Sequence, residues 1–492
     1  MNRSSDEPIP GRRAALKAAA AFGAALVWRP LSAFAFGRKS TQVKIFDVLK
    51  YGARGDGTAL DTAALQRAVD EAAAYSGKAQ VLLRGGRKYL VGTIELKGAI
   101  DFHVADDAQL LVSTRPEDYR GGLSDSGSAE SMAAAAGGVL VAEAAHGLSI
   151  TGTGVLQGRA KEFMQRYDPA GEWWVPKSFR PKMFVLTRCT GLEVRDITFA
   201  EAPNWGLHLL GCEQVLVDNL KVRNLLDVPN CDGIDPDHCR DVEIRNCDLI
   251  CGDDGIVLKT SRQNVDYGEC ANIHVHDCTV ETQDAGLKIG TETTSDIHDI
   301  RFERCTIKNA SRGLCIQLRD QASVYNIDFR DITFHSRYFA DPWWGRGEAI
   351  SLTAIPRNPS TTPGSLHHVT LANVTGTAEN SVRICGSPQS RVQDVLLDRI
   401  SVTLERTTSY PGGLFDNRPT TAQQAIEPHD TPGFSIEHAD NVTLRNCTVK
   451  WGARVPESFT YAVETRDATG VKIEGLSGGP ARKELGKATS NS

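Results

Sequence analysis

Three aspartates in two turns are the residues of this sequence best suited to chemistry. Asp232 lies in the run Asn-Cys-Asp-Gly-Ile-Asp, and Asp253 and Asp254 lie in the run Cys-Gly-Asp-Asp-Gly-Ile. Asp253 follows Asp232 by 21 residues. If the chain coils with about that period, the turns lie roughly 4.8 Å apart and the three carboxyl groups crowd together. Like charges that close raise at least one pKa. A protonated carboxyl beside an ionised one is the acid–base pair that hydrolysis of a glycosidic bond requires.

The same turns also have a purely structural interpretation. Asp- and Asn-rich turns are common in β-solenoids, where they cap turns or bind calcium, and Asp235 and Asp237 offer such carboxylates here. A single Gly-Asp-Asp run is a weak catalytic signal. Two aspartate-bearing turns one coil apart are a stronger one. We therefore predict a catalytic site that uses no metal and no cofactor.

The elements that must position these turns are short strands that repeat along the chain. Apolar and polar residues alternate within each unit, which gives every strand one buried face. The first five steps between units are 23, 27, 31, 27 and 27 residues. Helical repeats would show an apolar spacing of 3.6 residues, and propeller blades run to about 40–45 residues. We predict an all-β fold, one right-handed parallel β-helix of roughly ten coils, with units starting at Leu192, Val215, Val242, Ile273, Ile300, Ile327, Val369, Val395, Val442 and Val471.

The open ends of such a stack need covering. Residues 61–75 carry the one clear helix signal, with Asp61 or Thr62 as its cap. We expect this helix to close the first coil with one apolar face, formed by Leu65, Ala68, Val69 and Ala72. Residues 36–478 then make up the β-helix, and the polar residues 479–492 form a tail that is expected to fray.

Residues 1–35 have the organisation of an export signal. Gly-Arg-Arg-Ala-Ala-Leu-Lys resembles a twin-arginine motif, an apolar run of 11 residues follows, and Ala-Phe-Ala offers a small-x-small cleavage site. The apolar run is shorter than the about 20 residues that span a bilayer. The chain is therefore predicted to reach the periplasm or the medium by the twin-arginine route, without membrane insertion after export.

Composition excludes some functions. A formal charge of −6 over 492 residues lacks the basic footprint of a nucleic-acid-binding protein. Twelve cysteines would suggest disulfides in an exported protein. However, one position of the repeat is taken again and again by cysteine, and there the thiols would stack inside the core as small apolar groups: Cys247, Cys278, Cys305 and Cys447. The solenoid pattern gives no reason for oligomers, so we expect a monomer.

With these turns and repeats in view, the sequence resembles glycoside hydrolase family 28, the polygalacturonase family, and within it a divergent bacterial branch. Asn230-Cys-Asp matches the family's Asn-Thr-Asp motif with Cys for Thr, and Gly252-Asp-Asp matches its Gly/Gln-Asp-Asp motif. The resemblance runs from about residue 43 to at least 335. It implies a right-handed parallel β-helix and inversion at the anomeric carbon. It also implies that Asp253 is the general acid and that Asp232 and Asp254 hold the attacking water.

The sequence departs from the family where cations normally hold a galacturonate carboxylate. Ala285 stands where the family has His, and Cys315 and Gln317 stand where it has Arg and Lys. These departures weaken the inference that the substrate is polygalacturonic acid.

Three other cations are candidates to bind substrate instead. Lys259 follows the aspartate pair, Lys288 lies in the adjacent coil, and Arg319 shares a strand face with Gln317. The planar fork of an arginine suits a carboxylate. The alternative is that Lys288, Arg319 and Glu292 form a solvated polar ladder.

An insertion, Tyr-Phe-Ala-Asp-Pro-Trp-Trp-Gly-Arg-Gly-Glu, interrupts the repeat after residue 337. Insertions in solenoids are loops on one face, often the binding face. We expect its aromatic and charged residues to stack on sugar rings and to bond their hydroxyl or carboxylate groups: Trp343, Trp344, Arg346 and Glu348. The alternative is that the tryptophans plug the loop against the β-helix.

Further residues are candidates for the same cleft. A later loop, residues 410–419, is expected to flank it, and Trp205 and His208 lie one coil before Asp232. Both of these aromatic residues fit equally well in the core. Loops on both flanks would narrow the groove and favour attack at a chain end.

The function predicted is that of an inverting hydrolase acting on pectin-derived, galacturonate-containing or related acidic oligosaccharides. Two other functions stay open. A polysaccharide lyase on the same fold would use an Arg or Lys base, usually with calcium, and would release an unsaturated product. A non-catalytic carbohydrate-binding β-helix would have no need of three aspartates together. The expected partner in every case is an oligo- or polysaccharide.

Overall fold

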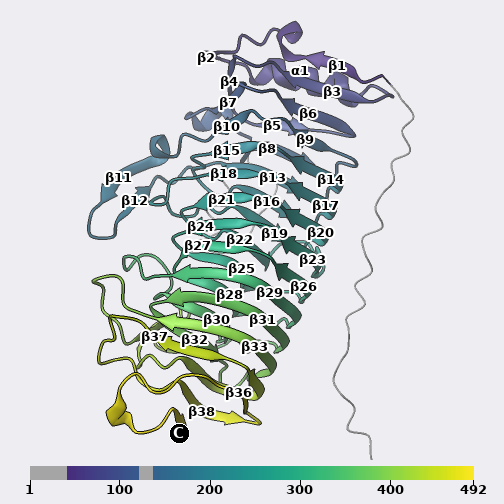
Figure 1. Ribbon diagram of the computed structural model, residues 1–492. Helices are drawn as coiled ribbons and strands as arrows, with labels where there is room; N and C mark the ends of the chain where they lie inside the picture. Colours follow the sequence, from purple (N-terminus) through teal and green to yellow (C-terminus); the bar gives the residue numbers. More distant parts are fainter. Residues whose placement is uncertain (1–41, 121–136, 492) are drawn as a thin grey trace, which may run out of the picture. The chain divides into compact units, whose positions relative to one another are not determined.

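Short strands coil into a right-handed parallel β-helix, which confirms the predicted fold (Figure 1). The computed structural model describes residues 42–120 and 137–491 of the chain. The export signal predicted for residues 1–35 lies outside the described residues. Coil after coil adds one strand to each of three parallel ladders, so that in the middle coils strands three apart in the chain, such as β14, β17 and β20, are hydrogen-bonded neighbours.

The first ladder is the one whose strands repeat visibly in the sequence. The predicted unit starts pair with one another, from Leu192 with Val215 through to Val395 with Val442. The ladder extends further on its N-terminal side, over four strands that the sequence repeat does not include. In order, the ladder is β1 (Lys44–Asp47), β3 (Ala79–Leu83), β6 (Ile100–Val104), β9 (Ser149–Thr151), β14 (Thr190–Arg195), β17 (Glu213–Asp218), β20 (Arg240–Arg245), β23 (Cys270–His276), β26 (Ile297–Glu303), β29 (Val324–Ser336), β31 (Leu366–Ala378), β33 (Val392–Leu404), β36 (Phe434–Arg445) and β39 (Lys472–Glu474).

The second ladder follows the first after a sharp bend. Its strands are β2 (Asp56–Leu60), β4 (Lys88–Val91), β7 (Gln109–Val112), β10 (Val155–Gln157), β15 (Thr198–Ala200), β18 (Lys221–Arg223), β21 (Asp248–Cys251), β24 (Thr279–Thr282), β27 (Thr306–Ala310), the second halves of β29, β31 and β33, and β37 (Thr448–Trp451).

The third ladder carries the chemistry described below. Its strands are β5 (Ile94–Leu96), β8 (Gly138–Glu143), β13 (Lys182–Thr187), β16 (Leu207–Leu210), β19 (Ile234–Asp237), β22 (Ile256–Thr260), β25 (Ala285–Thr293), β28 (Arg312–Leu318), β30 (Glu348–Ala354), β32 (Asn380–Cys385), the start of β36, β38 (Val463–Thr469) and β40 (Thr489–Asn491).

The Asn-Cys and Asp-Cys endings have a backbone cause. Asn246 and Asp277 end first-ladder strands with φ of 55° each, in the left-handed region that Asn and Asp tolerate better than most side chains. The cysteine that follows then points into the core. All twelve cysteines are buried and free, so the prediction of stacked thiols at Cys247, Cys278, Cys305 and Cys447 is confirmed.

The interior of the coils is a continuous apolar stack. In the third ladder Ile234, Ile256 and Leu287 lie one above the other with no exposed surface. Each such side chain gains about 1.5–3 kcal/mol from burial, but only while the next coil is in place. The end coils therefore need the covers described next.

A helix covers the N-terminal end of the stack, as predicted. α1 (Thr62–Ala73) buries Leu65 and Val69 among its apolar residues and packs on β1, β3 and β5. Asp61 holds the N-cap position, but its carboxylate accepts from the backbone N–H groups of Arg54 and Gly55 and makes no bond to the helix. Short 3-10 turns lie at Val48–Tyr51, Pro116–Asp118, Ala160–Phe163 and Lys483–Leu485.

The C-terminal tail differs from expectation. Instead of fraying, it returns to the β-helix, where β40 pairs in parallel with β38. The backbone N–H of Val463 donates to Ala488 and thereby ties the tail to the last coil. No helix within residues 42–120 and 137–491 is long and apolar enough to cross a membrane.

Candidate active site

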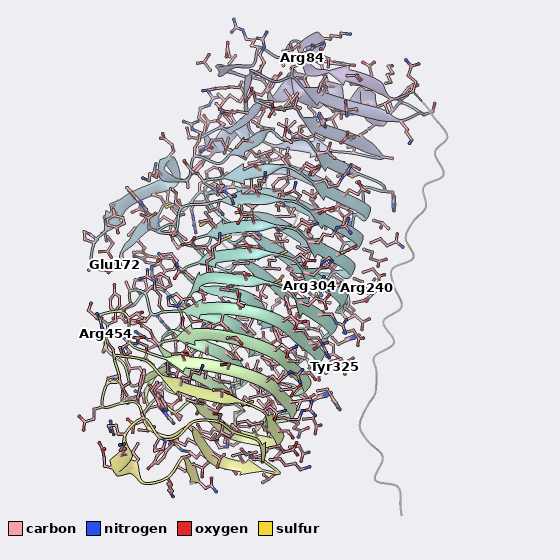
Figure 2. All side chains as sticks on the ribbon, in the orientation of Figure 1. Arg84, Glu172, Arg240, Arg304, Tyr325 and Arg454 are labelled. Carbon is pink, nitrogen blue, oxygen red and sulfur yellow. The ribbon has the colours of Figure 1, made fainter. Side chains whose placement is uncertain are left out.

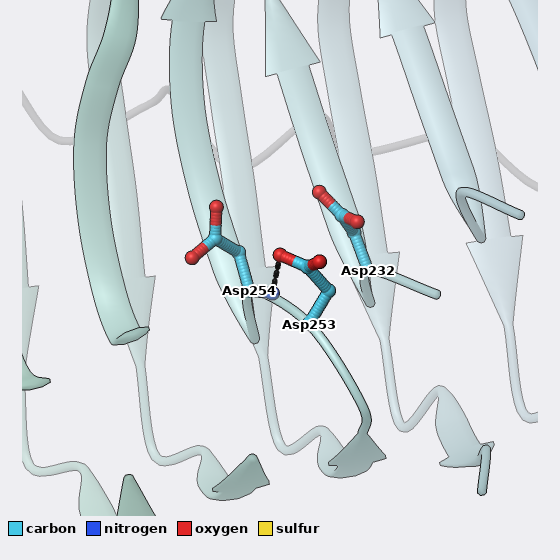
Figure 3. A group of neighbouring side chains, drawn as sticks. All are labelled: Asp232, Asp253 and Asp254. Atoms are coloured by element: carbon cyan, nitrogen blue, oxygen red, sulfur yellow. Dashed lines mark hydrogen bonds between the residues drawn. The ribbon is translucent and has the colours of Figure 1, made fainter. Parts of the chain in front are cut away.

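The three aspartates lie at the corner where the second ladder turns into the third. Asp232 lies two residues before β19, and Asp253 and Asp254 lie three and two residues before β22, in the next coil. The Gly233 N–H donates to the Asp254 carbonyl at 2.9 Å and fixes the two turns side by side. All three side chains lie side by side and project in the same direction (Figure 3).

The carboxyl groups are close and held. One oxygen from each of the three aspartates lies within 4.8 Å of the others. The two oxygens of Asp253 accept hydrogen bonds from the backbone N–H groups of Asn230 and Asp254, each at 2.9 Å, the second of which is drawn in Figure 3. The spacing argument from the sequence is therefore confirmed in its geometric part.

Burial and mutual repulsion disturb the protonation of this group. Burial raises the pKa of Asp232 well above its ordinary value, and the charges of Asp235 and Asp253 raise it further. Burial and the charge of Asp254 also raise the pKa of Asp253, although Lys288 and the two backbone N–H groups oppose the shift. The predicted rise is confirmed: a proton is retained among these carboxyl groups at pH values where exposed aspartates are ionised.

Two of the predicted lysines hold the aspartates from beneath. The ammonium group of Lys288 lies 2.6 Å from Asp254, and that of Lys259 lies 2.9 Å from Asp235 and 3.7 Å from Asp232. Burial lowers the pKa of both lysines, but the neighbouring carboxylates outweigh it and the net shift is upward. Both stay charged. The aspartate oxygens are close enough to ligate a cation, yet these lysines already supply positive charge there.

A cavity of about 410 Å³ opens over the aspartates. The predicted residues Trp343 and Trp344 line it, together with Lys259 and Lys288. Its lining also holds residues that the sequence analysis did not assign to the site or left undecided: Trp173, Arg180, Trp205, Asn230, Asp284 and Glu292. A signal for Asp284 existed, because it occupies the matching turn one coil after Asp253 and directly precedes β25.

Trp205 lines the cavity, and the ammonium groups of two lysines lie over its ring. The ammonium groups of Lys182 and Lys259 lie 3.8 and 3.9 Å from its ring centre, well within cation–π range. Lys182 approaches His208 Nδ1 at 3.1 Å, and His208 Nε2 approaches Asp237 at 3.2 Å. Burial lowers the pKa of Lys182 to about 7. Trp205 thus lies in the site and His208 in the layer behind it.

Three other predicted binding residues lie away from the cavity lining. Arg319 is fully buried and donates to the Thr353 hydroxyl at 3.1 Å and to the Asn417 carbonyl at 3.4 Å. Arg346 pairs with Asp341 at 2.8 Å, and the carboxylate of Glu348 accepts from the Arg346 backbone N–H at 2.6 Å. The structure brings none of Arg319, Arg346 and Glu348 to the wall of the cavity.

The cover over Arg319 is a hairpin formed by β34 (Leu414–Asp416) and β35 (Ile426–Pro428). Gln317, at the family's Lys position, donates to the Arg418 carbonyl at 2.8 Å. Cys315, at the Arg position, is fully buried. Ala285, at the His position, offers its backbone N–H to Asp254 at 3.3 Å.

Insertions at the same corner meet above the site. The hairpin of β11 (Met164–Asp168) and β12 (Trp173–Pro176) leaves the β-helix two coils before Asp232 and projects beside it (Figure 1). Figure 2 shows Glu172 at the tip of this hairpin, on the side away from Arg240 and Tyr325. The Tyr410 hydroxyl donates to Glu172, and Trp173 packs edge-on against Trp343 with ring centres 6.1 Å apart. Hairpin and later loops thereby bridge one another.

Comparison with known proteins decides the family. The pattern of glycosyl hydrolases family 28 matches residues 122–411, more than half of the chain. The chain belongs to this family. The resemblance stated from the Asp motifs is therefore confirmed.

Individual relatives are distant. A probable polygalacturonase of Vitis vinifera is 26% identical over 59% of this chain, which spans about 60% of that relative's length. An exopolygalacturonase of Zea mays is 24% identical over 78% of this chain and 89% of its own. The structure of a family 28 exopolygalacturonase from Yersinia enterocolitica superposes with a TM-score of 0.68 at 17% identity, over 88% of this chain and 79% of its own. It supports the fold.

Proposed function

We propose that the protein hydrolyses glycosidic bonds in pectin-derived oligosaccharides, with Asp253 as general acid and Asp232 and Asp254 holding the attacking water. The observation that carries the proposal is the group of three carboxyl groups at the cavity, within which burial and like charges raise the pKa of both Asp232 and Asp253. The family motif assigns the role of the acid to Asp253. Its proton is available to the leaving-group oxygen. Asp254 is kept beside it by Lys288, and Asp232 is reached by Lys259.

The proposal includes inversion at the anomeric carbon, as the family resemblance implies. The nearest oxygens of the three aspartates are within 4.8 Å of one another. Carboxyl groups of inverting enzymes are usually about 6.5–9.5 Å apart, and those of retaining enzymes about 5–5.5 Å. Because the spacing does not favour inversion by itself, NMR of the first-formed anomer is the test. A product with the anomeric configuration of the substrate would contradict the inverting assignment.

Attack at a chain end is the third part of the proposal. The contacts of Glu172 with Tyr410 and of Trp173 with Trp343 join insertions from both flanks of the aspartates. A polysaccharide chain cannot continue through a bridged groove, whereas a chain end can enter it. The names of the maize and Yersinia proteins, both exopolygalacturonases, agree with this arrangement.

The decisive experiment measures reducing-end release from homogalacturonan, rhamnogalacturonan fragments and pectic side-chain mixtures. We expect release by the wild type that is lost in Asp253→Asn, because the amide cannot donate the acid proton. An unsaturated product absorbing in the ultraviolet would indicate a lyase instead. Binding without release, unchanged in Asp253→Asn, would indicate a carbohydrate-binding protein.

We further propose that the chain is exported folded, by the twin-arginine route, to the periplasm or beyond and acts as a monomer. The twelve buried free thiols support this, because a chain that crossed unfolded would expose all of them to an oxidising compartment. Cell fractionation with Arg12→Lys and Arg13→Lys together is the test, and light scattering gives the oligomeric state. Unchanged export of the double variant would contradict the route.

A further inference from the structure

We propose that the sugar residue held in the cavity is uncharged, either a neutral sugar or a methyl-esterified uronate, and not a free uronate. This rests on the proposed function and names the substrate class of the same site. The argument concerns positive charge. Among the described residues, the cations that line the cavity are Arg180, Lys259 and Lys288, and each is already held by groups of the protein itself.

The two lysines are fully engaged with carboxylates. Lys288 lies 2.6 Å from Asp254, and Lys259 lies 2.9 Å from Asp235. Each lysine is only 3% exposed. A buried ion pair is stable as a pair, and a second carboxylate on the same lysine would add a desolvated charge without a partner. The remaining ammonium protons suit hydroxyl oxygens instead.

Arg180 is anchored to the backbone. Its guanidinium donates to the carbonyls of Pro203 and Pro229 at 3.2 and 2.9 Å and to the side-chain oxygen of Asn230 at 2.9 Å. It is 6% exposed, and the nearby charges of Asp253 and Asp232 act on it. The guanidinium group of Arg180 therefore supports the turn before Asp232 and is not available to bind a ligand carboxylate.

Negative groups dominate the rest of the lining. Five carboxyl side chains face the cavity: Asp232, Asp253, Asp254, Asp284 and Glu292. Asp284 shows how the cavity acts on a carboxylate: burial and the charge of Asp254 raise its pKa well above the ordinary value. The same conditions disfavour a carboxylate brought in by a substrate. Carboxylates only accept hydrogen bonds, so sugar hydroxyl groups, which donate, complement this wall.

Among the described residues of the next coils, no further cation lines the cavity. Where the family has Arg and Lys, this chain has Cys315 and Gln317, and the hairpin β34–β35 covers Gln317 through the Arg418 carbonyl. Arg312 and Arg319 lie in the same coil but are fully buried beneath that hairpin. The aromatic walls, among them Trp173 and Trp344, offer surfaces for the apolar faces of a sugar ring.

The test compares substrates whose sugar residues differ in charge. One matched pair is α-1,4-linked trigalacturonate as free acid and the same trisaccharide with its carboxyl groups reduced. A second pair is made of rhamnogalacturonan oligosaccharides whose non-reducing end is either a neutral sugar or a galacturonate. We expect kcat/KM to be higher by at least about tenfold for the uncharged end, which corresponds to about 1.4 kcal/mol. Asp253→Asn accompanies every measurement.

Two failures are distinguishable. Release that depends on Asp253 but favours the free acid, or treats both equally, overturns this inference and leaves the proposed hydrolase intact. No Asp253-dependent release from any member overturns the proposed function as well. A variant tests the role of the negative charges: Glu292→Gln removes one negative charge from the cavity lining and should shift the substrate preference toward the free acid severalfold. Glu117→Gln removes a charge from an exposed side chain and should leave the preference unchanged.

Discussion

The outer face of the third ladder has two regions that share one architecture and differ in what lies on top. Over β19, β22 and β25 the face opens into the cavity with its aspartates; we call this the open region. Over β28, β30 and β32 the hairpin β34–β35 lies on it; we call this the covered region. Arg312, Arg319 and Arg383 of the covered region are fully buried. The strands of both regions form one parallel ladder, whose pairing is regular except for a shift between Leu258 and Thr260 in the β22–β25 pair.

One buried aspartate in each region shows how the two regions differ in their effect on a pKa. Burial raises the pKa of Asp253 in the open region, where Asp254 adds a like charge. Burial acts on Asp416 in the covered region too, but Arg418 and Arg312 outweigh it and its pKa is lowered. One carboxyl group therefore keeps a proton ready for transfer, and the other is a fixed anion that holds structure. The coils supply position, and the insertions decide which role a buried acid takes.

The covered region also supports the cavity wall. Asp416 accepts from the Gly345 backbone N–H at 2.8 Å, and Arg418 donates to the Trp343 carbonyl at 2.7 Å. These bonds hold the loop whose two tryptophans line the cavity. The polar residues of the outer face thus have two uses, chemistry in the open region and anchoring in the covered region.

The strongest way to break the comparison is to remove one acid from each region. Asp253→Asn should lower kcat by about 10²–10⁴, the usual contribution of a general acid. Its unfolding free energy should fall by only about 1–3 kcal/mol, because the amide nitrogen of Asn cannot accept one of the two backbone N–H bonds that Asp253 accepts. Asp416→Asn should instead cost about 3–5 kcal/mol of unfolding free energy, because it leaves Arg312 and Arg418 without their anion.

Steady-state kinetics and urea unfolding of both variants give the answer. The two effects must differ in kind: Asp253→Asn should lose most of its kcat at a small cost in unfolding free energy, whereas Asp416→Asn should lose more unfolding free energy and keep the acid. If Asp253→Asn retained kcat within about tenfold, it would be excluded as the acid. If Asp416→Asn unfolded like the wild type, the covered region would not depend on its ion pairs.

The sequence was sufficient for features that depend on the coil period. Asp232, Asp253 and Asp254 meet because one repeat separates their turns, and Lys288 follows from the next repeat. Contacts between distant insertions were out of reach. Arg312 bonds Asp416, 104 residues away, and Tyr410 bonds Glu172, 238 residues away. No local pattern encodes such pairs.

Arg319 shows the consequence for site prediction. Its strand face was inferred correctly from its spacing to Gln317, since both point outward and both bond the covering hairpin. What the spacing could not reveal is that a loop folded from much later residues would cover that face. The strand face to which a side chain points depends on the local sequence, whereas its exposure depends on how distant parts of the chain fold over it.

A smaller effect separates the charges within the open region. Lys288 lowers the pKa of Asp253, so Lys288→Met should raise it further. The acid form then persists to higher pH, and the alkaline limb of kcat/KM should move upward by about one pH unit. Lys472→Met, which removes an exposed lysine from β39, is the matched control and should leave the profile in place. A shift to lower pH would show that Asp253 is not the group that sets this limb.

The smallest effect tests whether the two flanks are truly joined across the groove. Tyr410→Phe removes the hydroxyl that donates to Glu172 and should cost about 0.5–1.5 kcal/mol of that contact. Because the packing of Trp173 on Trp343 remains, the bridge should loosen without opening fully. The share of mid-chain products in the first minutes of digestion should therefore rise slightly, while kcat on a short oligosaccharide stays the same. Tyr167→Phe makes the same chemical change on the β11–β12 hairpin that carries Glu172, at a side chain that is 40% exposed. It should alter neither the share of mid-chain products nor kcat. If Tyr410→Phe combined with Trp173→Ala still gave only chain-end products, the bridge would not be what limits the enzyme to chain ends, and the depth of the cavity itself would have to account for it.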